Sequence, residues 1–127
     1  MDKLKKEITI TAQGTIADIQ TEFKRFYPFL SVVFFTSGTG IITEKNKVQS
    51  NSVISKITQL NSTVKLNVAD ERTVAEVEKD CVELLGLLAQ VQRKSGNVWN
   101  AISITNGWTL QCQNLAAECI STEMQST

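Results

Sequence analysis

TIADIQTEFKRFYPFLSVVFFTSG (Thr15–Gly38) and TVAEVEKDCVELLGLLAQVQRKSG (Thr73–Gly96) align without a gap at a separation of 58 residues. Both stretches begin with Thr-x-x-Asp or Thr-x-x-Glu, the sequence of a helix capping box. In both, apolar residues then recur at spacings of three, four and three, which is typical of a helix with one buried face. Both end in Ser-Gly, a pair that favours a tight turn. Because the same signals follow in the same order, we interpret the chain as an internal repeat, and this repeat decides the fold.

A strand is expected before each helix and two more after it. Apolar and polar residues alternate at Ile8–Ala12 and Val64–Val68, as in a strand with one buried face. Pro28 and Gly86 end the two helices at equivalent places. The predicted elements of the two copies are the helices 15–27 and 73–85, the second strands 30–36 and 88–94, the hairpin turns 37–38 and 95–96, the third strands near 40–43 and 98–104, and closing helices near 52–60 and 109–117.

The predicted fold is α+β, a tandem of two β-α-β-β-(α) units that form a mixed sheet with the two long helices on one face. The sheet is expected to be mixed because a helical connection joins neighbouring parallel strands. We place the repeats at about residues 7–60 and 64–120. Neither unit could bury its helix stripe well alone, so residues 1–127 are expected to form a single domain.

Composition and charge favour a soluble globular protein. Hydrophobic residues make up 42% and charged residues 20% of the 127 residues, close to globular averages. The formal net charge is zero, whereas nucleic-acid-binding proteins concentrate basic charge, so no nucleic-acid partner is expected. No apolar run is long enough to span a membrane or to act as a secretory signal, so no membrane association is expected. Three cysteines without a CxxC spacing are typical of reduced thiols and indicate a cytoplasmic protein.

The sequence holds little that could perform catalysis. It has no histidine, the commonest general base and metal ligand, and no phosphate-binding glycine motif. Cys81 occupies the apolar stripe of the second helix, where packing is its expected role. Cys112 and Cys119 lie seven residues apart, on one face of a continuous helix, without a cationic neighbour to activate them. We therefore predict no catalytic residue, no metal and no cofactor, and a protein that is not an enzyme.

One predicted strand, Ser31–Phe35, is apolar on both faces. Val32 and Phe34 point to one face, and the next residue along from each points to the other. The long helices cover only one of these faces, and the counterpart strand in the second copy alternates with glutamines instead. The second face needs cover from the chain's own C-terminal segment or from another subunit. We predict a second subunit or a partner protein, with Val32, Phe34 and Phe35 as candidate interaction residues.

Both tryptophans lie in one segment of the second copy, beside a group of amides. Trp supplies a rigid binding platform, and Gln or Asn side chains read amides or hydroxyls. The alternative is structural, with a buried Trp at the end of the sheet and Asn106-Gly107 as the turn before a helix. The candidate interaction residues of this segment are Trp99, Trp108, Gln111, Gln113 and Asn114.

The same segment carries a resemblance. SGNVW (Ser95–Trp99) followed by TNGWTLQCQN (Thr105–Asn114) resembles a pattern shared by small uncharacterised bacterial proteins, which implies a bacterial source. In that group an acidic residue usually precedes the Trp of the WTL motif, where this chain has Asn106-Gly107. The tandem architecture is also similar to the gyrase-inhibitor-like domains, some of which bind small molecules between their modules. That similarity is one of architecture and carries over no ligand residue.

Two classes of function are open, with an enzyme of unknown type as a third. The leading hypothesis is a non-enzymatic protein-binding or interaction module, with a homodimer as one form of it. The alternative is a small-molecule-binding domain with its cleft between the two repeats. Exposed aromatic residues on a flat outer patch would favour the first, and a concave cleft would favour the second.

Overall fold

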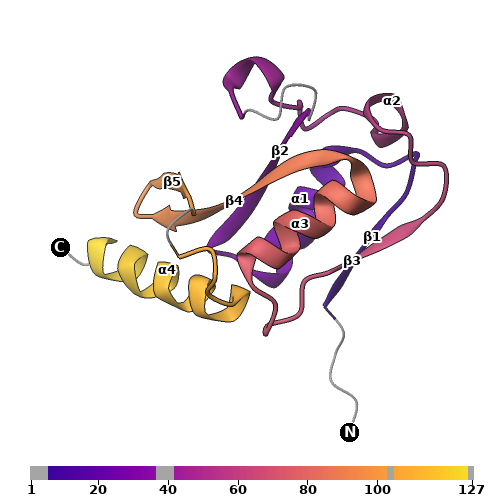
Figure 1. Cartoon of the computed structure of the whole chain (residues 1–127). Coiled ribbons are helices and arrows are strands. Elements are labelled where there is room, and N and C mark those ends of the chain that lie inside the picture. The colour runs from indigo at the N-terminus through magenta and orange to yellow at the C-terminus, as the bar shows by residue number, and fades with distance from the viewer. Residues whose placement is uncertain (1–5, 37–41, 103–104, 126–127) are drawn as a thin grey trace, which may run out of the picture.

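The computed structural model describes residues 6–36, 42–102 and 105–125, with side chains to residue 120. Its class is α+β, as predicted, with helices packed on two small sheets. In chain order the elements are β1 (Glu7–Ile10), α1 (Ile16–Phe26), β2 (Leu30–Thr36), the 3₁₀ turn η1 (Glu44–Asn46), α2 (Ile54–Ile57), β3 (Val64–Asn67), α3 (Val74–Leu85), β4 (Leu87–Ser95), β5 (Val98–Ala101) and α4 (Leu110–Gln125) (Figure 1).

The two long helices form where the capping boxes predict them. The Thr15 hydroxyl accepts from the Asp18 N–H at 3.4 Å, and the Asp18 carboxylate accepts from the Thr15 N–H at 3.0 Å. Thr73 and Glu76 repeat this exchange at 3.1 and 2.9 Å. Each box satisfies two of the amides that a helix start leaves unpaired. The prediction of both helices and both caps is confirmed, and α3 ends at Gly86 with a left-handed φ of 68°.

The prediction of one mixed sheet is wrong, because the described strands form two antiparallel sheets. β1 pairs with β3 around Ile8 and Leu66, and β2 pairs with β4 around Val33 and Gln90. β5 joins the free side of β4, also antiparallel. β1 and β2, from the first half of the chain, therefore pair with β3 and β4, from the second half, and β4 also pairs with β5 of its own half.

The third strand differs between the halves. In the second half, β4 and β5 form the predicted hairpin, but its turn is at Gly96-Asn97, one residue later than the predicted 95–96, and β5 ends at Ala101 and not at Ile104. In the first half, the predicted turn 37–38 and residues 40–41 of the predicted strand 40–43 lie outside the described residues; residues 42–43 are not in a strand, and η1 follows them. The closing helices also differ from the prediction, because α2 has 4 residues and α4 has 16.

Leu30 on β2 and Leu87 on β4 are both buried. The gap-free alignment matches Leu30 instead with Leu88, which is half-buried. The connections between helix and strand differ in length, since Pro28-Phe29 separates Tyr27 from β2 while a single residue, Gly86, separates α3 from β4.

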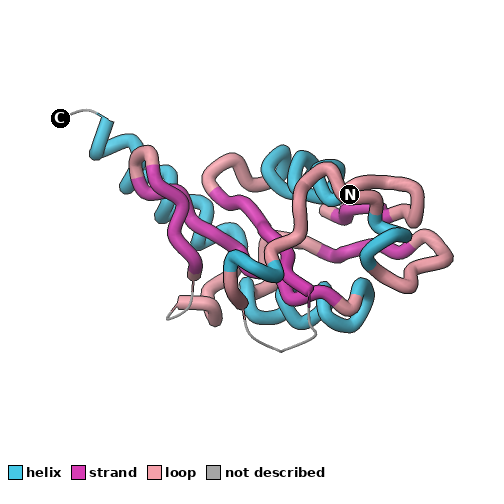
Figure 2. Tube along the Cα trace, turned by 90° about the horizontal axis from the view of Figure 1, so that it is seen from above, coloured by secondary structure: helices cyan, strands magenta, loops and turns pink. Residues whose placement is uncertain are grey.

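The main core draws on both halves of the chain. α1 packs on β1 and β2, and α3 packs on β3 and β4; Figure 2 shows the helices and strands from above. The first half contributes Ile8, Ile10, Ile16, Ile19, Phe23, Leu30, Val32, Phe34, Val48 and Ile54, and the second half contributes Leu66, Val68, Val74, Val77, Cys81, Leu87, Ala89, Val91, Ile102 and Leu110.

Side chains from the long helices bind the outer edges of β2 and β4. The Gln20 amide on α1 donates to Val32 O at 2.9 Å, and the Glu78 carboxylate on α3 accepts from the Val91 N–H at 2.9 Å. Burial raises the pKa of Glu78, and the hydrogen bond from Val91 opposes that effect only in part. A strand edge needs such partners, because its main-chain groups have no strand beside them there.

We predict that Glu78→Gln stabilises the protein at pH 7. Since native Glu78 holds its proton to higher pH than the unfolded chain does, its contribution becomes unfavourable as pH rises through the raised pKa. The variant keeps an acceptor for Val91 and loses this pH dependence. Urea unfolding at pH 5 and pH 7 measures both effects, with Glu83→Gln on the exposed side of α3 as the control. A less stable Glu78→Gln at pH 7, with an unchanged Glu83→Gln, would show that the charge itself stabilises the fold.

Candidate functional site

The three candidates on β2 are interior residues. Val32 and Phe34 belong to the main core, with 3% and 0% of their surface exposed. Phe35 is 4% exposed and lies outside the main core cluster, on the opposite face of β2. The prediction that this second face lacks cover within the chain is therefore wrong at Phe35, and only Val33 on that face is half-buried.

The cover at this edge of β2 comes from the first half of the chain. Lys47 bridges to Phe35, and the Val48 N–H donates to Phe34 O at 2.8 Å. The Asn46 amide donates to Thr36 O at 2.9 Å. The segment after η1 therefore lies along the β2 edge beside Phe35. Val32, Phe34 and Phe35 offer almost no accessible surface in the single chain.

The side chains of Gln113 and Asn114 form hydrogen bonds within the chain. Gln113 is fully buried, donates to Thr105 O at 2.6 Å and accepts from the Arg93 guanidinium at 3.2 Å. The Asn114 carbonyl accepts from the Phe29 N–H at 2.9 Å. These bonds hold α4 against the sheet, which matches the structural alternative for both residues.

The remaining candidates of the segment do not converge on one place. Trp99 on β5 is half-buried beneath the Lys24 ammonium, which lies 4.9 Å from its ring centroid. Trp108 is 49% exposed just before α4, and Gln111 is exposed on the first turn of that helix. The eight predicted residues are thus divided among the core, β5 and α4, and they form no single site.

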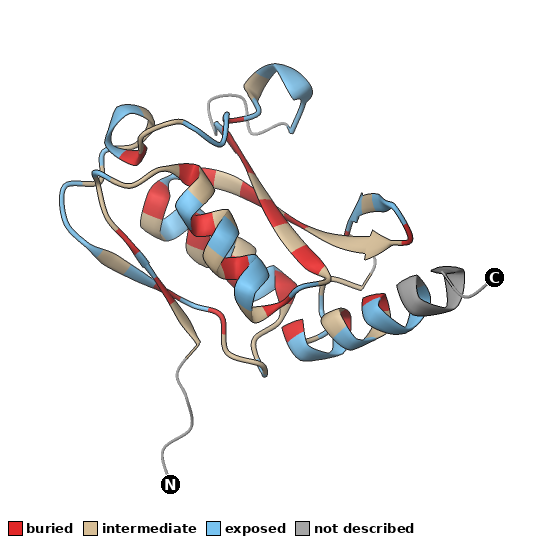
Figure 3. Cartoon of the chain, turned by 180° about the vertical axis from the view of Figure 1, so that it is seen from behind, coloured by how far each residue is buried: buried red, intermediate tan, exposed pale blue. Residues whose placement is uncertain are grey.

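A surface that we did not predict runs along α4. Trp108, Cys112, Leu115 and Cys119, spaced four, three and four residues apart, are all exposed; we name these four residues the α4 stripe. Leu110, Gln113 and Ala117 lie on the other face of the helix and are fully buried. α4 begins beside the start of α3 and runs away from the two long helices (Figures 1 and 3). The sequence did contain the signal, because apolar residues occur on two faces of this helix.

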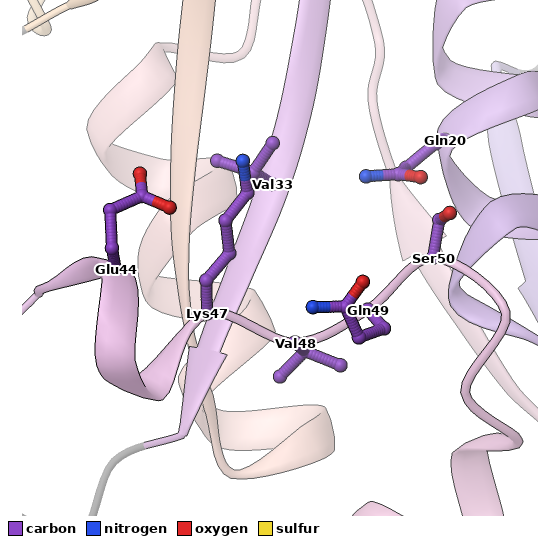
Figure 4. Close-up of a pocket in the computed structure, with 7 residues that line it drawn as sticks. All are labelled: Gln20, Val33, Glu44, Lys47, Val48, Gln49 and Ser50. Atoms are coloured by element: carbon purple, nitrogen blue, oxygen red, sulfur yellow. The ribbon is translucent and has the colours of Figure 1, made fainter.

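A hollow of about 370 Å³ lies at the edge of β2, and we name it the β2-edge pocket (Figure 4). All of its lining comes from the first half of the chain, so it is not the cleft between the repeats that one hypothesis requires. The lining residues are Gln20, Val33, Glu44, Lys47, Val48, Gln49 and Ser50.

Two ionisable groups in the interior have unusual acidity because they are buried. Burial raises the pKa of the Cys81 thiol to about 12. Burial likewise raises the pKa of the Tyr27 phenol, whose oxygen lies 2.6 Å from Val68 O and 2.9 Å from the Asp70 carboxylate. Lys6 completes this group with an ion pair to Asp70 at 2.6 Å. Tyr27 thereby ties the end of α1 to the loop between β3 and α3.

Comparison with known proteins gives no relative. No family model, curated protein or solved structure matches this chain. Within the described ranges, no helix is long and apolar enough to cross a membrane, and no three acidic or cysteine side chains gather as metal ligands would. The resemblances drawn from the SGNVW and WTL motifs and from the tandem architecture stay predictions.

Proposed function

We propose that this protein is a non-enzymatic interaction module that presents the α4 stripe to a groove on a partner protein. The observation that carries the proposal is the exposure of Trp108 (49%), just before α4, and of Leu115 (52%) on α4, whose opposite face is fully buried at Leu110, Gln113 and Ala117. A helix fixed along one face displays the other in a set orientation. Anchors at spacings of four, three and four are the pattern by which amphipathic helices bind apolar grooves.

The comparison of α4 with α2 supports a tandem duplication, with units at about residues 7–60 and 64–120. α2 begins with hydrogen bonds from the Ile54 and Ser55 N–H groups to the loop before α1, each 2.9 Å long. α4 begins with hydrogen bonds from the Leu110 and Gln111 N–H groups to the loop before α3, at 2.8 and 3.3 Å. In this proposal the two helices are equivalent, and α1 and α3 share one face of the β2–β4 sheet.

The length of α4 is the largest departure from that equivalence. α2 ends after 4 residues at Ile57, whereas α4 continues through 16 residues. The last fully buried residue described on α4 is Ala117, and residues 118–120 are exposed. The fold of the first half is complete with a single turn of closing helix. The additional turns of α4 therefore support a role outside the core.

The charge of α4 defines the chemistry of the partner. Leu110–Gln125 carries Glu118 and Glu123 and no Lys or Arg. A groove with an apolar floor and basic side chains at its rim would complement this helix. A second copy of the chain fits less well, because it would bring two acidic helices together. If two copies met only through their α4 stripes, each would contribute four side chains, far fewer than the roughly 20–30 residues per partner of a stable interface. A groove contacts the flanks of the helix in addition to the stripe.

Photo-cross-linking in cells that express the protein tests the proposal. The cross-linker is p-benzoylphenylalanine at position 111, because Gln111 is exposed beside the stripe. We expect one main cross-linked protein with the otherwise unchanged chain, and at least about a tenfold loss of it after Leu115→Gln, since central apolar anchors dominate such interfaces. Val98→Gln is the matched control, because Val98 is 58% exposed but lies on β5. Equal cross-linking by Leu115→Gln and Val98→Gln contradicts the proposal, and so does cross-linking only between copies of this chain.

A further inference from the structure

We infer that the β2-edge pocket binds a small zwitterion, a molecule with one ammonium group and one carboxylate, such as a free amino acid. This site is separate from the α4 stripe and lies in the other half of the chain. Four observations lead to it: a missing stretch of strand, a polar lining on an apolar floor, an amide held in place, and two opposite charges that do not pair with each other.

Among the described residues of the first half, none forms a strand beside β2 as β5 does beside β4. In the second half, β5 runs beside β4, and the chain after it donates from the Ile102 N–H to Val91 O at 3.1 Å. In the first half, Val48 makes the corresponding bond to β2, but the chain then leaves the strand. Ser50 O accepts instead from the Ala17 N–H at 2.7 Å, on α1. The segment from Val48 to Ser50 therefore arches from β2 to α1 and leaves a hollow beside the strand.

The lining combines an apolar floor with neutral hydrogen-bonding groups. Val33 and Val48 supply the apolar surface, while Gln20, Gln49 and Ser50 supply two amides and a hydroxyl (Figure 4). The Gln20 amide is already fixed, because its nitrogen donates to Val32 O at 2.9 Å. An amide held by the strand edge needs no further ordering when a ligand arrives.

Glu44 and Lys47 give the pocket one charge of each sign. Their side chains rise on the same side of the hollow, close to Val33 (Figure 4). Neither forms an ion pair with the other or with any other described residue. Because these two opposite charges line one hollow without forming an ion pair, a ligand that carries both charges can pair with each of them.

The ligand class follows from this arrangement. The Lys47 ammonium complements a ligand carboxylate, and the Glu44 carboxylate complements a ligand ammonium, through charge-assisted hydrogen bonds. The amides and the hydroxyl suit a polar side chain. A volume of about 370 Å³ is at the small end of the range for ligand pockets and has room for an amino acid.

Titration with L-glutamine, followed by ¹H–¹⁵N NMR of the full chain, tests this inference. We expect saturable shifts of the Gln20 and Gln49 side-chain amide signals, and no such shifts with N-acetyl-glutaminamide, which lacks both charges. Lys47→Gln and Glu44→Gln should each weaken binding at least about tenfold. Lys45→Gln is the control, because Lys45 is an exposed residue of η1 that does not line the pocket.

Three results would overturn the inference: no saturable shift with L-glutamine at 10 mM, equal shifts with the uncharged analogue, or equal binding by Lys47→Gln and Lys45→Gln. The Leu115→Gln variant should bind L-glutamine as the unchanged chain does. Failure of this test therefore leaves the α4 proposal standing, and failure of the α4 test leaves this one standing.

Discussion

Iodoacetamide at pH 7.5 is expected to modify Cys112 and Cys119 in the native protein at least about a thousandfold faster than Cys81. The thiolate is the reactive form, and each unit of pKa reduces its amount about tenfold. Burial raises the pKa of Cys81 to about 12 from a reference value of 9.0, whereas both cysteines on α4 are exposed. Cys81 is also fully covered by the core, so modification requires local opening. Mass spectrometry of the modified peptides over time measures the three rates.

Repeating the reaction in 6 M guanidinium chloride provides the control, because all three thiols are then exposed and should react at similar rates. Modification of Cys81 in the native protein as fast as that of Cys112 would mean that the stripe of α3 is not in the core. The placement of Cys81 in the main core with Phe23 would then be wrong as well.

Replacing Phe34 with alanine should lower the free energy of unfolding by about 3–5 kcal/mol, the usual result for a buried aromatic side chain. Phe34 is fully buried in the main core, on β2 opposite Ala89 of β4, where strands of the two halves pair. Such a loss is a large part of the roughly 5–15 kcal/mol that stabilises an ordinary domain. Urea denaturation followed by circular dichroism measures it.

Val33→Ala is the matched control for this prediction, because Val33 directly precedes Phe34 on β2 and is half-buried on the other face. It should lower stability by no more than about 1.5 kcal/mol, a small aliphatic truncation outside the core. If Phe34→Ala lowered stability no more than Val33→Ala, the assignment of the two faces of β2 would be wrong. Because a Phe34 variant is expected to be destabilised, it cannot be used to test whether β2 mediates association with a second subunit or a partner protein.

The sequence predicted the local structure well and the pairing of strands poorly. Capping boxes and helical spacing involve residues within one or two turns, so Thr15 and Thr73 located both long helices. Strand alternation shows which residues are buried, but it does not show which strand lies beside which. The alignment of the two strands is ambiguous for a similar reason. Leu87 and Leu88 are adjacent and equally apolar, so the sequence does not show which of them matches Leu30.

The candidate site was predictable in part. Gln113 lies three residues after Leu110 and four before Ala117, a spacing that places it on the buried stripe of α4. That spacing was enough to predict that Gln113 is buried, unlike the exposed residues of the same segment. The cover over Phe35 had no such signal, because the segment that follows η1 is mostly polar. The β2-edge pocket was not predictable either, since it arises where the segment Val48–Ser50 leaves the edge of β2 for α1.

The affinity of the purified cross-linked partner for this chain tests the central claim most directly. Isothermal titration should show that Leu115→Gln weakens binding at least about tenfold, while Val98→Gln leaves it unchanged. The free energy of unfolding of Leu115→Gln should stay within about 0.5 kcal/mol of the unchanged chain, because Leu115 is 52% exposed. Equal affinity of both variants, or a loss of stability in Leu115→Gln that accounts for its weaker binding, would contradict the role of the α4 stripe.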